Sequence, residues 1–392
     1  MSQPAIPALV LGTGITALGT IRALGEAGIE SYLATDNPEF VASSRWYNKI
    51  SLPPNGTPSL PTLQELLEGV KFERMVIIPC ADNWVRVVAN LPANYGNRFV
   101  SSVPSPQIID RLLDKRCFAQ TLEAATIPHP RTVLLNSPED LARIPDQELE
   151  GAFLKPCDSQ SFMRAYGVKG CRIENREAGL KHLSSVLKDG FSVVLQEYIP
   201  GPPTSHYFID GYVGRDGKMA ACFSRRRLRM FPPDFGNSTY MQSVSNEEVC
   251  GAVDSLRRLW QALGYRGIFS AEFKLDSRDS QFKILEVNAR PWWYIEFATS
   301  CGVNVAEMAY RDALQLEFKP VARYRVGRRA IFLYEDRKAY SYLAGRREIG
   351  FFDWLVSCAK SHEMTFNWRD PLPSFVYFAS AGKRYIRNHF LA

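Results

Sequence analysis

Two carboxylates, an amide and a guanidinium are spaced in this sequence so that they could bind a metal ion and phosphate. Glu286, Asn288 and Arg290 alternate along one predicted strand, so their side chains share one face. Glu272 lies on the preceding predicted strand, about as far from the intervening turn, and is therefore expected opposite Glu286. Facing carboxylates repel, and a Mg²⁺ ion with oxygen ligands would compensate them. Neutralisation by Arg290 or by Lys274 is the alternative interpretation.

A lysine at the end of an apolar stretch is a candidate phosphate ligand. Lys155 lies near the end of the predicted strand of residues 151–156 and precedes a polar loop. Its ammonium group could act as a point charge on phosphate oxygens, while small residues let backbone N–H groups approach the same oxygens. A solvated lysine at a sheet edge is the plainer alternative. The small and basic residues of the loop are Ser159, Ser161, Gly167, Lys169 and Gly170.

Residues 194–201 could contact a nucleotide base. A predicted strand runs there into Pro200 and Gly201, so backbone groups released from the sheet could pair with a purine edge. An ordinary strand end followed by a turn is the alternative. The sequence contains no G-x-x-x-x-G-K-[ST] motif, which excludes a phosphate-binding loop of that kind.

Predicted strands alternate with predicted helices over the first 113 residues, which indicates a parallel α/β layer. The strands are expected at residues 8–12, 31–35 and 73–80. A capping box from Thr62 to Glu65 predicts where one of the helices begins. Gly12 and Gly14, with Asp36 after the second strand, could bind a dinucleotide, or the glycines could serve only to pack a helix on a strand.

The pattern changes from residue 114 onward and predicts an α+β region. Helices are expected at residues 115–125 and 249–263, and strands at residues 192–198, 207–213, 219–227, 268–275 and 281–287. A capping box from Ser245 to Glu248 predicts the start of the second helix. Along residues 219–227, Arg225 and Arg227 share one strand face and Arg226 lies on the other. We expect one of these faces to reach a substrate carboxylate or phosphate.

In their order and separation, these groups resemble the ATP-grasp superfamily over roughly residues 1–319. The segments that carry the resemblance are Lys115, Lys155, residues 196–201, residues 271–274 and residues 285–290. The resemblance implies an α/β and α+β fold: a Rossmann-like domain at residues 1–113, a two-lobed ATP-grasp domain at 114–319 and a small basic appendage at 320–392. The lobes of the ATP-grasp domain would cover about residues 114–195 and 196–319.

The resemblance also implies roles for individual residues, with ATP as the nucleotide and Mg²⁺ or Mn²⁺ as the metal. The implied metal ligands are Glu272, Glu286 and Asn288. The implied nucleotide ligands are Lys115, Lys155, Gln196, Glu197, Tyr198 and Ile199. The implied catalytic residues are Arg290, Arg225 and Arg227. In one departure from the family, Thr204-Ser205 replaces the acidic residue that often holds the ribose.

The function that the resemblance implies is an ATP-dependent ligase. It would activate a small carboxylate as an acyl phosphate for attack by an amine or another nucleophile. A relative that activates bicarbonate is the nearest competitor within this class. An NAD(P)-dependent oxidoreductase built on Gly12 and Asp36, or a nucleotide-binding module without catalysis, are the alternatives from other classes.

Charge, cysteine spacing and the lack of long apolar segments bear on the partners and location of the protein. The 392 residues carry a net charge of +6, and the segment from Pro320 to the end has 13 basic and 6 acidic residues. The tail is therefore the basic part, and we expect it to be a packed appendage, with a partner-docking element or a membrane-surface contact as alternatives. The spacing of the eight cysteines and the absence of a long apolar segment predict a cytoplasmic protein with no membrane span. No nucleic-acid partner is expected, and the oligomeric state stays open.

Overall fold

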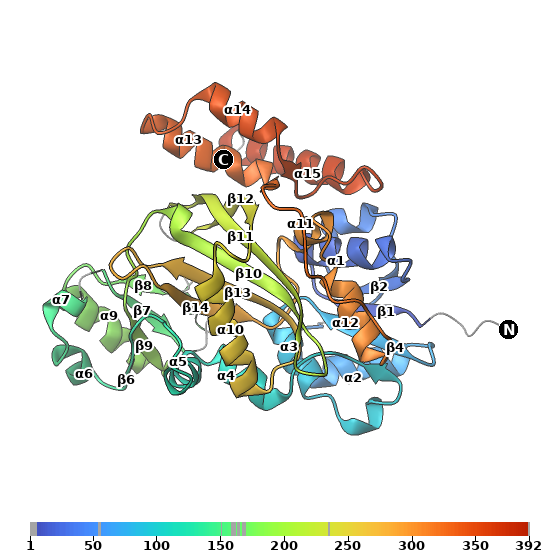
Figure 1. The fold of residues 1–392 in the computed structure, drawn as a ribbon, viewed down its shortest axis with the longest axis horizontal. Coiled ribbons are helices and arrows are strands. Elements are labelled where there is room, and N and C mark those ends of the chain that lie inside the picture. Colours follow the sequence, from blue (N-terminus) through green and yellow to red (C-terminus); the bar gives the residue numbers. More distant parts are fainter. Residues whose placement is uncertain are drawn as a thin grey trace.

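The structure, a computed structural model, describes residues 6–390 except 54–55, 150, 158–161, 163–164, 167–169 and 234–235, with side chains up to residue 382. Three sheets organise the chain, and Figure 1 shows them side by side with a group of helices at one end. Of the loop residues predicted to approach phosphate, Ser159, Ser161, Gly167 and Lys169 lie outside the described residues.

The first sheet is parallel throughout and has the strand order β3-β2-β1-β4-β5. Its strands are β1 (Ala8–Leu11), β2 (Ser31–Ala34), β3 (Lys49–Ile50), β4 (Met75–Pro79) and β5 (Phe99–Val100). The helices between and after them are α1 (Gly14–Glu26), α2 (Leu60–Gly69), α3 (Asp82–Ala89) and α4 (Pro106–Leu113), with the short 3-10 helices η1 (Glu39–Ser43) and η2 (Ala93–Tyr95). The central strands β1 and β4 are buried along their whole length, as a sheet covered on both faces requires. The predicted parallel α/β layer is confirmed.

Both predicted capping boxes are wrong about where their helices begin. Helix α2 begins at Leu60, and its cap is Ser59, whose Oγ accepts a hydrogen bond from the Thr62 backbone N–H. The earlier start is possible because Pro61 lies in the first turn, where a backbone donor is not needed. Helix α10 (Cys250–Leu263) begins after the second box, and Ser245 Oγ accepts from the Glu248 N–H in a turn that precedes the helix.

The second sheet is small and antiparallel, with the order β6-β9-β7-β8. Its strands are β6 (Thr132–Leu135), β7 (Phe153–Pro156), β8 (Cys171–Arg172) and β9 (Val193–Gln196). Helix α5 (Lys115–Ala124) precedes this sheet, and α6 (Pro138–Ala142), α7 (Asp146–Leu149) and α9 (Arg176–Lys188) accompany it. Asp114 caps α5, because its side chain accepts from the Cys117 N–H, and this places Lys115 at the first helical position.

The third sheet has seven strands in the order β14-β13-β10-β11-β12-β15-β16. They are β10 (His206–Val213), β11 (Met219–Phe231), β12 (Asn237–Val244), β13 (Gly267–Leu275), β14 (Phe282–Asn288), β15 (Arg329–Ile331) and β16 (His362–Glu363). The 3-10 helix η3 (Pro203–Ser205) precedes β10, and the helices α11 (Ile295–Ser300) and α12 (Val305–Ala313) follow β14. Helix α10 packs on one face of this sheet, where Leu256 joins the same apolar core as Ile209 and Phe273. The other face carries the polar side chains described below.

The tail continues the third sheet and adds three helices, α13 (Leu333–Gly345), α14 (Phe351–Ala359) and α15 (Leu372–Phe390). Arg22 of α1 is almost fully buried and binds both Glu296 at 2.7 Å and Asp370 at 2.9 Å. Asp336 of α13 is likewise buried and pairs with Arg229 of β11 at 2.7 Å. Removing one partner from such a pair leaves a charge uncompensated, so the tail is bound firmly to the rest of the chain.

No helix of the described residues is long and apolar enough to cross a membrane. All eight cysteines are free thiols.

Candidate active site

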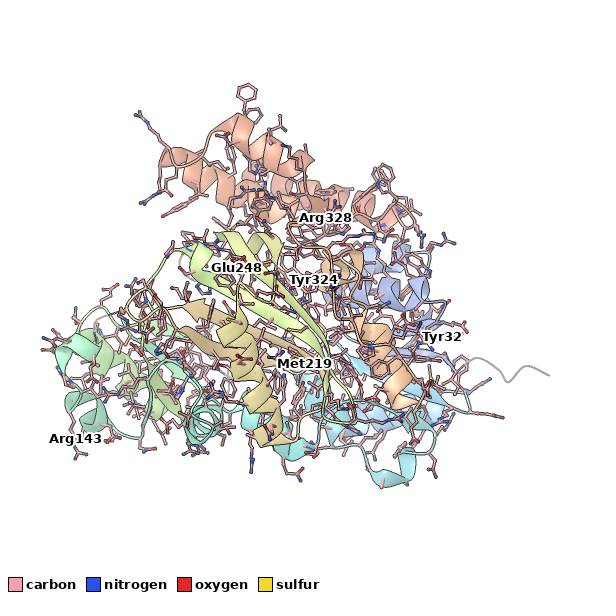
Figure 2. The ribbon with its side chains drawn as sticks, viewed as in Figure 1. Tyr32, Arg143, Met219, Glu248, Tyr324 and Arg328 are labelled. Carbon is pink, nitrogen blue, oxygen red and sulfur yellow. The ribbon has the colours of Figure 1, made fainter. Side chains whose placement is uncertain are left out.

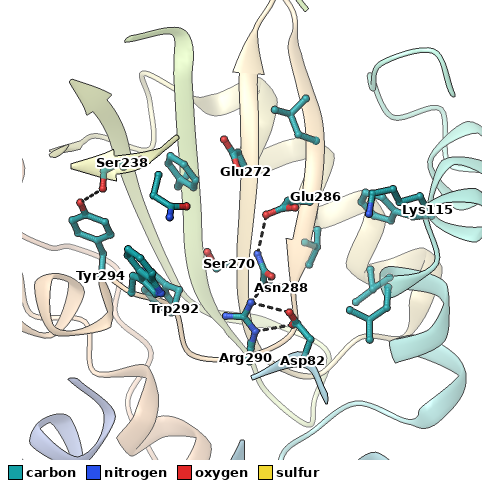
Figure 3. A pocket seen from close by; sticks show the side chains of 18 of the residues that line it. Asp82, Lys115, Ser238, Ser270, Glu272, Glu286, Asn288, Arg290, Trp292 and Tyr294 are labelled. Atoms are coloured by element: carbon teal, nitrogen blue, oxygen red, sulfur yellow. Dashed lines mark hydrogen bonds and ion pairs between the residues drawn. The ribbon is translucent and has the colours of Figure 1, made fainter. Parts of the chain in front are cut away.

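A cavity of about 620 Å³ is lined by strands of the second and third sheets and by the helices α3, α4 and α5, and Figure 3 shows part of its lining. Among the described residues, six cationic and three acidic side chains line it. The cationic residues are Arg86, Lys115, Lys155, Arg225, Arg227 and Arg290, and the acidic residues are Asp82, Glu272 and Glu286. The surplus of positive charge favours an anionic ligand. We call this cavity the cleft.

The hairpin of β13 and β14 places two carboxylates in the cleft. Glu272 and Glu286 are direct partners across the hairpin, with a bulge immediately after Glu272. The predicted opposition of the two carboxylates is therefore confirmed. Asn288 follows on the same face of β14, and its Nδ2 donates to Glu286 Oε1 at 3.4 Å.

The side chains that neutralise Glu272 are not the two that the sequence suggested. Its Oε1 accepts from His206 Nδ1 at 2.8 Å and from Arg227 Nη2 at 3.1 Å, whereas the sequence suggested Arg290 or Lys274. His206 lies on β10 and Arg227 on β11, and the pairing of these strands places both side chains beside Glu272 on β13. The sequence alone does not reveal how the three strands are aligned. Burial would raise the pKa of Glu272, but Arg227 and His206 outweigh it and hold the pKa well below its usual range.

The residues on this face fit a magnesium ion that is shared with phosphate oxygens. Glu272, Glu286 and Asn288 supply oxygen atoms, the ligand type that Mg²⁺ prefers. Within the described part of the chain, no group of three or more His, Cys, Asp or Glu side chains could hold a metal by itself. Mg²⁺ commonly binds one or two carboxylates and completes its shell with water and substrate phosphates, which suits a site with two carboxylates and one amide.

Arg290 is oriented by a residue from the first sheet's layer. Its Nε and Nη2 donate to the two carboxylate oxygens of Asp82 at 2.7 and 2.9 Å, and Nη2 also donates to Asn288 Oδ1 at 2.9 Å. Burial would lower the pKa of Arg290, but Asp82 outweighs it and raises the pKa. Asp82 is the first residue of α3, directly after β4 and Cys80. Sequence analysis gave Asp82 no role. An acidic residue just after a buried parallel strand could have indicated one, because ligands bind at the carboxyl ends of such strands.

Two lysines approach the cleft from the second sheet's side. Lys155 on β7 donates from Nζ to Gln196 Oε1 at 2.6 Å, and Lys115 begins α5. Burial, together with the charge of Lys115, lowers the pKa of Lys155 to about 8. The negative charge of a bound polyanion would raise the pKa of such a buried lysine and restore its ammonium form. Lys155 is therefore suited to bind phosphate.

The predicted base-binding segment lies beside the cleft. A second cavity of about 20 Å³ shares Lys115, Phe118 and Leu285 with the cleft and extends to Gln196. The described lining of both cavities does not include Glu197, Tyr198 or Ile199.

Glu197 and Tyr198, which follow Gln196 in the predicted base-binding segment, contact neighbouring residues. The Glu197 carboxylate accepts from Arg278 at 2.5 Å and from the Arg131 N–H at 3.0 Å. The Tyr198 ring lies 4.7 Å from Lys274 Nζ. The side chains of Glu197 and Tyr198 thus stiffen the connection between β9 and η3.

The three consecutive arginines of β11, Arg225 to Arg227, alternate as the sequence predicted. Arg225 and Arg227 line the cleft, whereas Arg226 lies on the other face and donates to the Thr204 backbone oxygen at 2.7 Å. Buried Asp210 accepts from Arg225 at 2.5 and 3.3 Å, so much of this charge is already compensated. Arg227 donates to Ser238 Oγ at 2.8 Å as well as to Glu272, and both arginines are buried.

Aromatic side chains form the wall next to Arg290. Trp292, Trp293 and Tyr294 line the cleft, and Tyr294 is fixed because its hydroxyl donates to the Ser238 backbone oxygen at 2.6 Å. Trp292 is buried, whereas Trp293 is exposed. Arg86 and Asn83 of α3 also line the cleft.

The glycine turn after β1 serves packing. A Cβ atom on Gly12 would lie 2.8 Å from the Cys80 Cβ, and Gly12 has a φ of +153°, so a side chain is excluded there. The described lining of the cleft includes neither this turn nor Asp36, which is exposed. The arrangement favours the interpretation in which the glycines pack α1 and β4 against β1.

No protein-family profile matches the sequence. A D-aspartate ligase of Enterococcus faecium is 23% identical over 252 residues, which cover 62% of this chain and 59% of that protein. A tetrahydromethanopterin:alpha-L-glutamate ligase of Methanocaldococcus jannaschii is 26% identical over 228 residues, 56% of this chain and 72% of that protein. The biotin carboxylase of Campylobacter jejuni superposes with a TM-score of 0.64 at 16% identity and covers 83% of this chain and 74% of that chain. The chain thus spans less than two thirds of the D-aspartate ligase, and the structural match establishes the fold.

Proposed function

We propose that this chain, which has the ATP-grasp fold, is an ATP-dependent ligase that activates a carboxylate as an acyl phosphate for attack by an amine. The observation that carries the proposal is the direct pairing of Glu272 with Glu286 in a cleft with six cationic side chains. A carboxylate that attacks the terminal phosphoryl group of ATP gathers negative charge in one place, and fixed cations on several sides stabilise that charge.

The residues of the cleft divide this work between them. In the first step the substrate carboxylate oxygen bonds to the terminal phosphorus of ATP, and the bond to the ADP oxygen breaks. Lys115 and Lys155 neutralise the phosphates that are not transferred, and Arg290 stabilises the transferring group in the position that Asp82 gives it. Glu272, Glu286 and Asn288 would hold a magnesium ion, which would supply positive charge to offset the negative charge of the phosphates. In the second step the amine nitrogen bonds to the acyl carbon, phosphate leaves, and the nitrogen loses a proton.

An amino acid is the favoured class of amine. Both relatives are named for ligation of an acidic amino acid, and Arg86 lies at the cleft as a partner for an additional carboxylate. Its side chain is half exposed, and its ion pair with Asp110 is 3.6 Å long, so the guanidinium can be recruited by a ligand at little cost.

The oxidoreductase and the non-catalytic module are supported less well. Gly12 of the glycine turn packs closely against Cys80, and the described lining of the cleft includes neither this turn nor Asp36, so a dinucleotide there would lie apart from the charged cleft. A binding module without catalysis needs neither Arg290 nor its bidentate anchor on Asp82.

The test is phosphate release from ATP with carboxylates, bicarbonate included, crossed with amines that include D- and L-aspartate and D- and L-glutamate. We expect release only when one carboxylate and one amine are both present, together with a new amide detected by mass spectrometry. Release that requires bicarbonate alone would replace the ligase with a carboxylating relative. Release at the same rate with and without every pair would refute the proposal.

A further inference from the structure

The tail helices carry an apolar surface that faces solvent. Trp368 is 88% exposed, Phe352 78% and Phe375 65%. The remaining members of this surface are Phe351, Leu355 and Val356 on α14 and Leu372 and Val376 on α15. Figure 1 shows α13, α14 and α15 together at one end of the molecule, and Figure 2 shows side chains projecting from that end. We call these eight residues the tail surface.

The tail surface follows the helical repeat on both helices. Its members on α14 are spaced i, i+1, i+4 and i+5, and those on α15 are spaced i, i+3 and i+4. Each helix therefore presents a continuous outer stripe of large apolar side chains. A stripe of this kind is not explained by scattered surface apolar residues, which occur singly in most proteins.

Other residues of the same helices already bind them to the protein. On α14, Trp354 Nε1 donates to Asp336 at 2.9 Å, and Ser357 Oγ accepts from Arg229 at 2.8 Å. On α15, the ring of Tyr377 packs edge-on against Phe40 with centroids 5.1 Å apart. Two members of the tail surface also touch neighbouring rings, Phe351 at Trp354 and Trp368 at Phe366, but both stay exposed. The exposed apolar area of the tail surface calls for an external partner.

Charge identifies that partner. Residues 320–392 hold 13 basic and 6 acidic side chains, whereas the rest of the chain holds 34 basic and 35 acidic ones. The exposed cations Arg346, Arg347, Lys360 and Arg369 lie on or next to the elements that carry the tail surface, and Arg346 also pairs with exposed Glu348 at 2.7 Å. A second copy of this chain would bring two positive tails together, which like charges disfavour.

We propose that the tail surface docks this protein on an anionic lipid bilayer, with α14 and α15 lying in the interface. Interfacial helices combine an outward apolar stripe with basic residues, and tryptophan favours the headgroup region. Basic residues beside such helices are attracted to the negative charge of anionic lipids. Because none of these helices is able to span the bilayer, the contact is peripheral and reversible. The proposal does not depend on what the cleft binds, since no member of the tail surface lines it.

The test is co-sedimentation of the full chain with vesicles of mixed phosphatidylcholine and phosphatidylglycerol, compared with vesicles of phosphatidylcholine alone. We expect binding to the mixed vesicles that weakens with added salt, and at least about tenfold weaker binding to the neutral ones. The double variant Phe352→Ser with Phe375→Ser should lose at least about tenfold in binding to mixed vesicles. Leu316→Ser is the matched control, because Leu316 is also exposed but lies outside the tail surface, and it should bind as the wild type does.

Four results would overturn the proposal. They are no binding to the mixed vesicles, equal binding to both kinds of vesicle, unchanged binding of the double variant, and a concentration-dependent dimer that the double variant abolishes. Melting temperatures of both variants should equal that of the wild type, since the substituted side chains face solvent. A second pair of changes, Lys360→Gln with Arg369→Gln, should weaken binding to the mixed vesicles and flatten its salt dependence.

Discussion

Glu286→Gln is expected to abolish metal-dependent turnover of ATP while leaving the fold intact. The amide keeps the shape of the side chain but removes the charge that would bridge a magnesium ion to phosphate oxygens, so the rate should fall by at least about 100-fold. In metal-free protein the same change removes a like charge opposite Glu272. The free energy of unfolding should therefore stay constant or rise by a few tenths of a kcal/mol, in the range typical of opposed charges on a sheet.

The measurement for this variant pairs phosphate release with melting temperature, each with and without MgATP. Asp279→Asn is the matched control, because Asp279 lies in the turn of the same hairpin and binds Lys283 at 2.7 Å outside the cleft. The control should retain wild-type turnover. Near-normal turnover of Glu286→Gln would remove the metal role from this residue and, with it, the main residue-level support for a ligase.

Arg290→Lys is expected to separate ATP binding from turnover. A lysine keeps the positive charge but cannot bind both oxygens of Asp82 and Asn288 Oδ1 at once, so the charge loses its fixed position. We expect the dissociation constant of MgATP to change by less than about threefold and kcat to fall by about 100-fold or more. Asp82→Asn should lower kcat in the same direction by a smaller factor, because one hydrogen-bond acceptor for the guanidinium remains.

If Arg290 had only a structural role, the variant would show a different set of changes. It would lower the melting temperature and weaken ATP binding together with turnover. Arg257→Lys is the control, since Arg257 forms an exposed ion pair with Asp254 at 2.6 Å and lies outside the cleft. Unchanged kcat in Arg290→Lys would show that the planar guanidinium is not needed for phosphoryl transfer.

The hairpin shows how far the sequence predicts the site. Counting residues outward from the turn placed Glu272 opposite Glu286, because antiparallel pairing fixes the partner of each residue once the turn is located. The parallel α/β layer was likewise predictable from the alternation of strands and helices. The ATP-grasp fold was predictable from the segments that carry the resemblance, above all residues 271–274 and 285–290. The domain boundaries and residue roles implied by the resemblance remain predictions.

The partners that complete the site were not predictable. Asp82 and Arg290 lie 208 positions apart, and nothing local marks either as the other's partner. His206 and Arg227 reach Glu272 only because β10 and β11 pair in one particular register. The strand β12 was missed because its residues are largely polar. Helix α15 was not predicted because Pro373, near its start, is typical of a loop. Proline is nevertheless tolerated in the first turn of a helix.

A calorimetric titration of MgATP into the wild-type chain at pH 8, in two buffers with different ionisation enthalpies, tests the central claim most directly. Burial lowers the pKa of Lys155 to about 8, so the side chain can take up a proton in this pH range. The triphosphate should favour the ammonium form, so binding should take up protons and weaken as the pH rises further. Lys155→Ala should lose this proton uptake. The account predicts saturable binding of MgATP with proton uptake and no binding of NADH; absence of a saturable MgATP signal, or micromolar binding of NADH in its place, would contradict it.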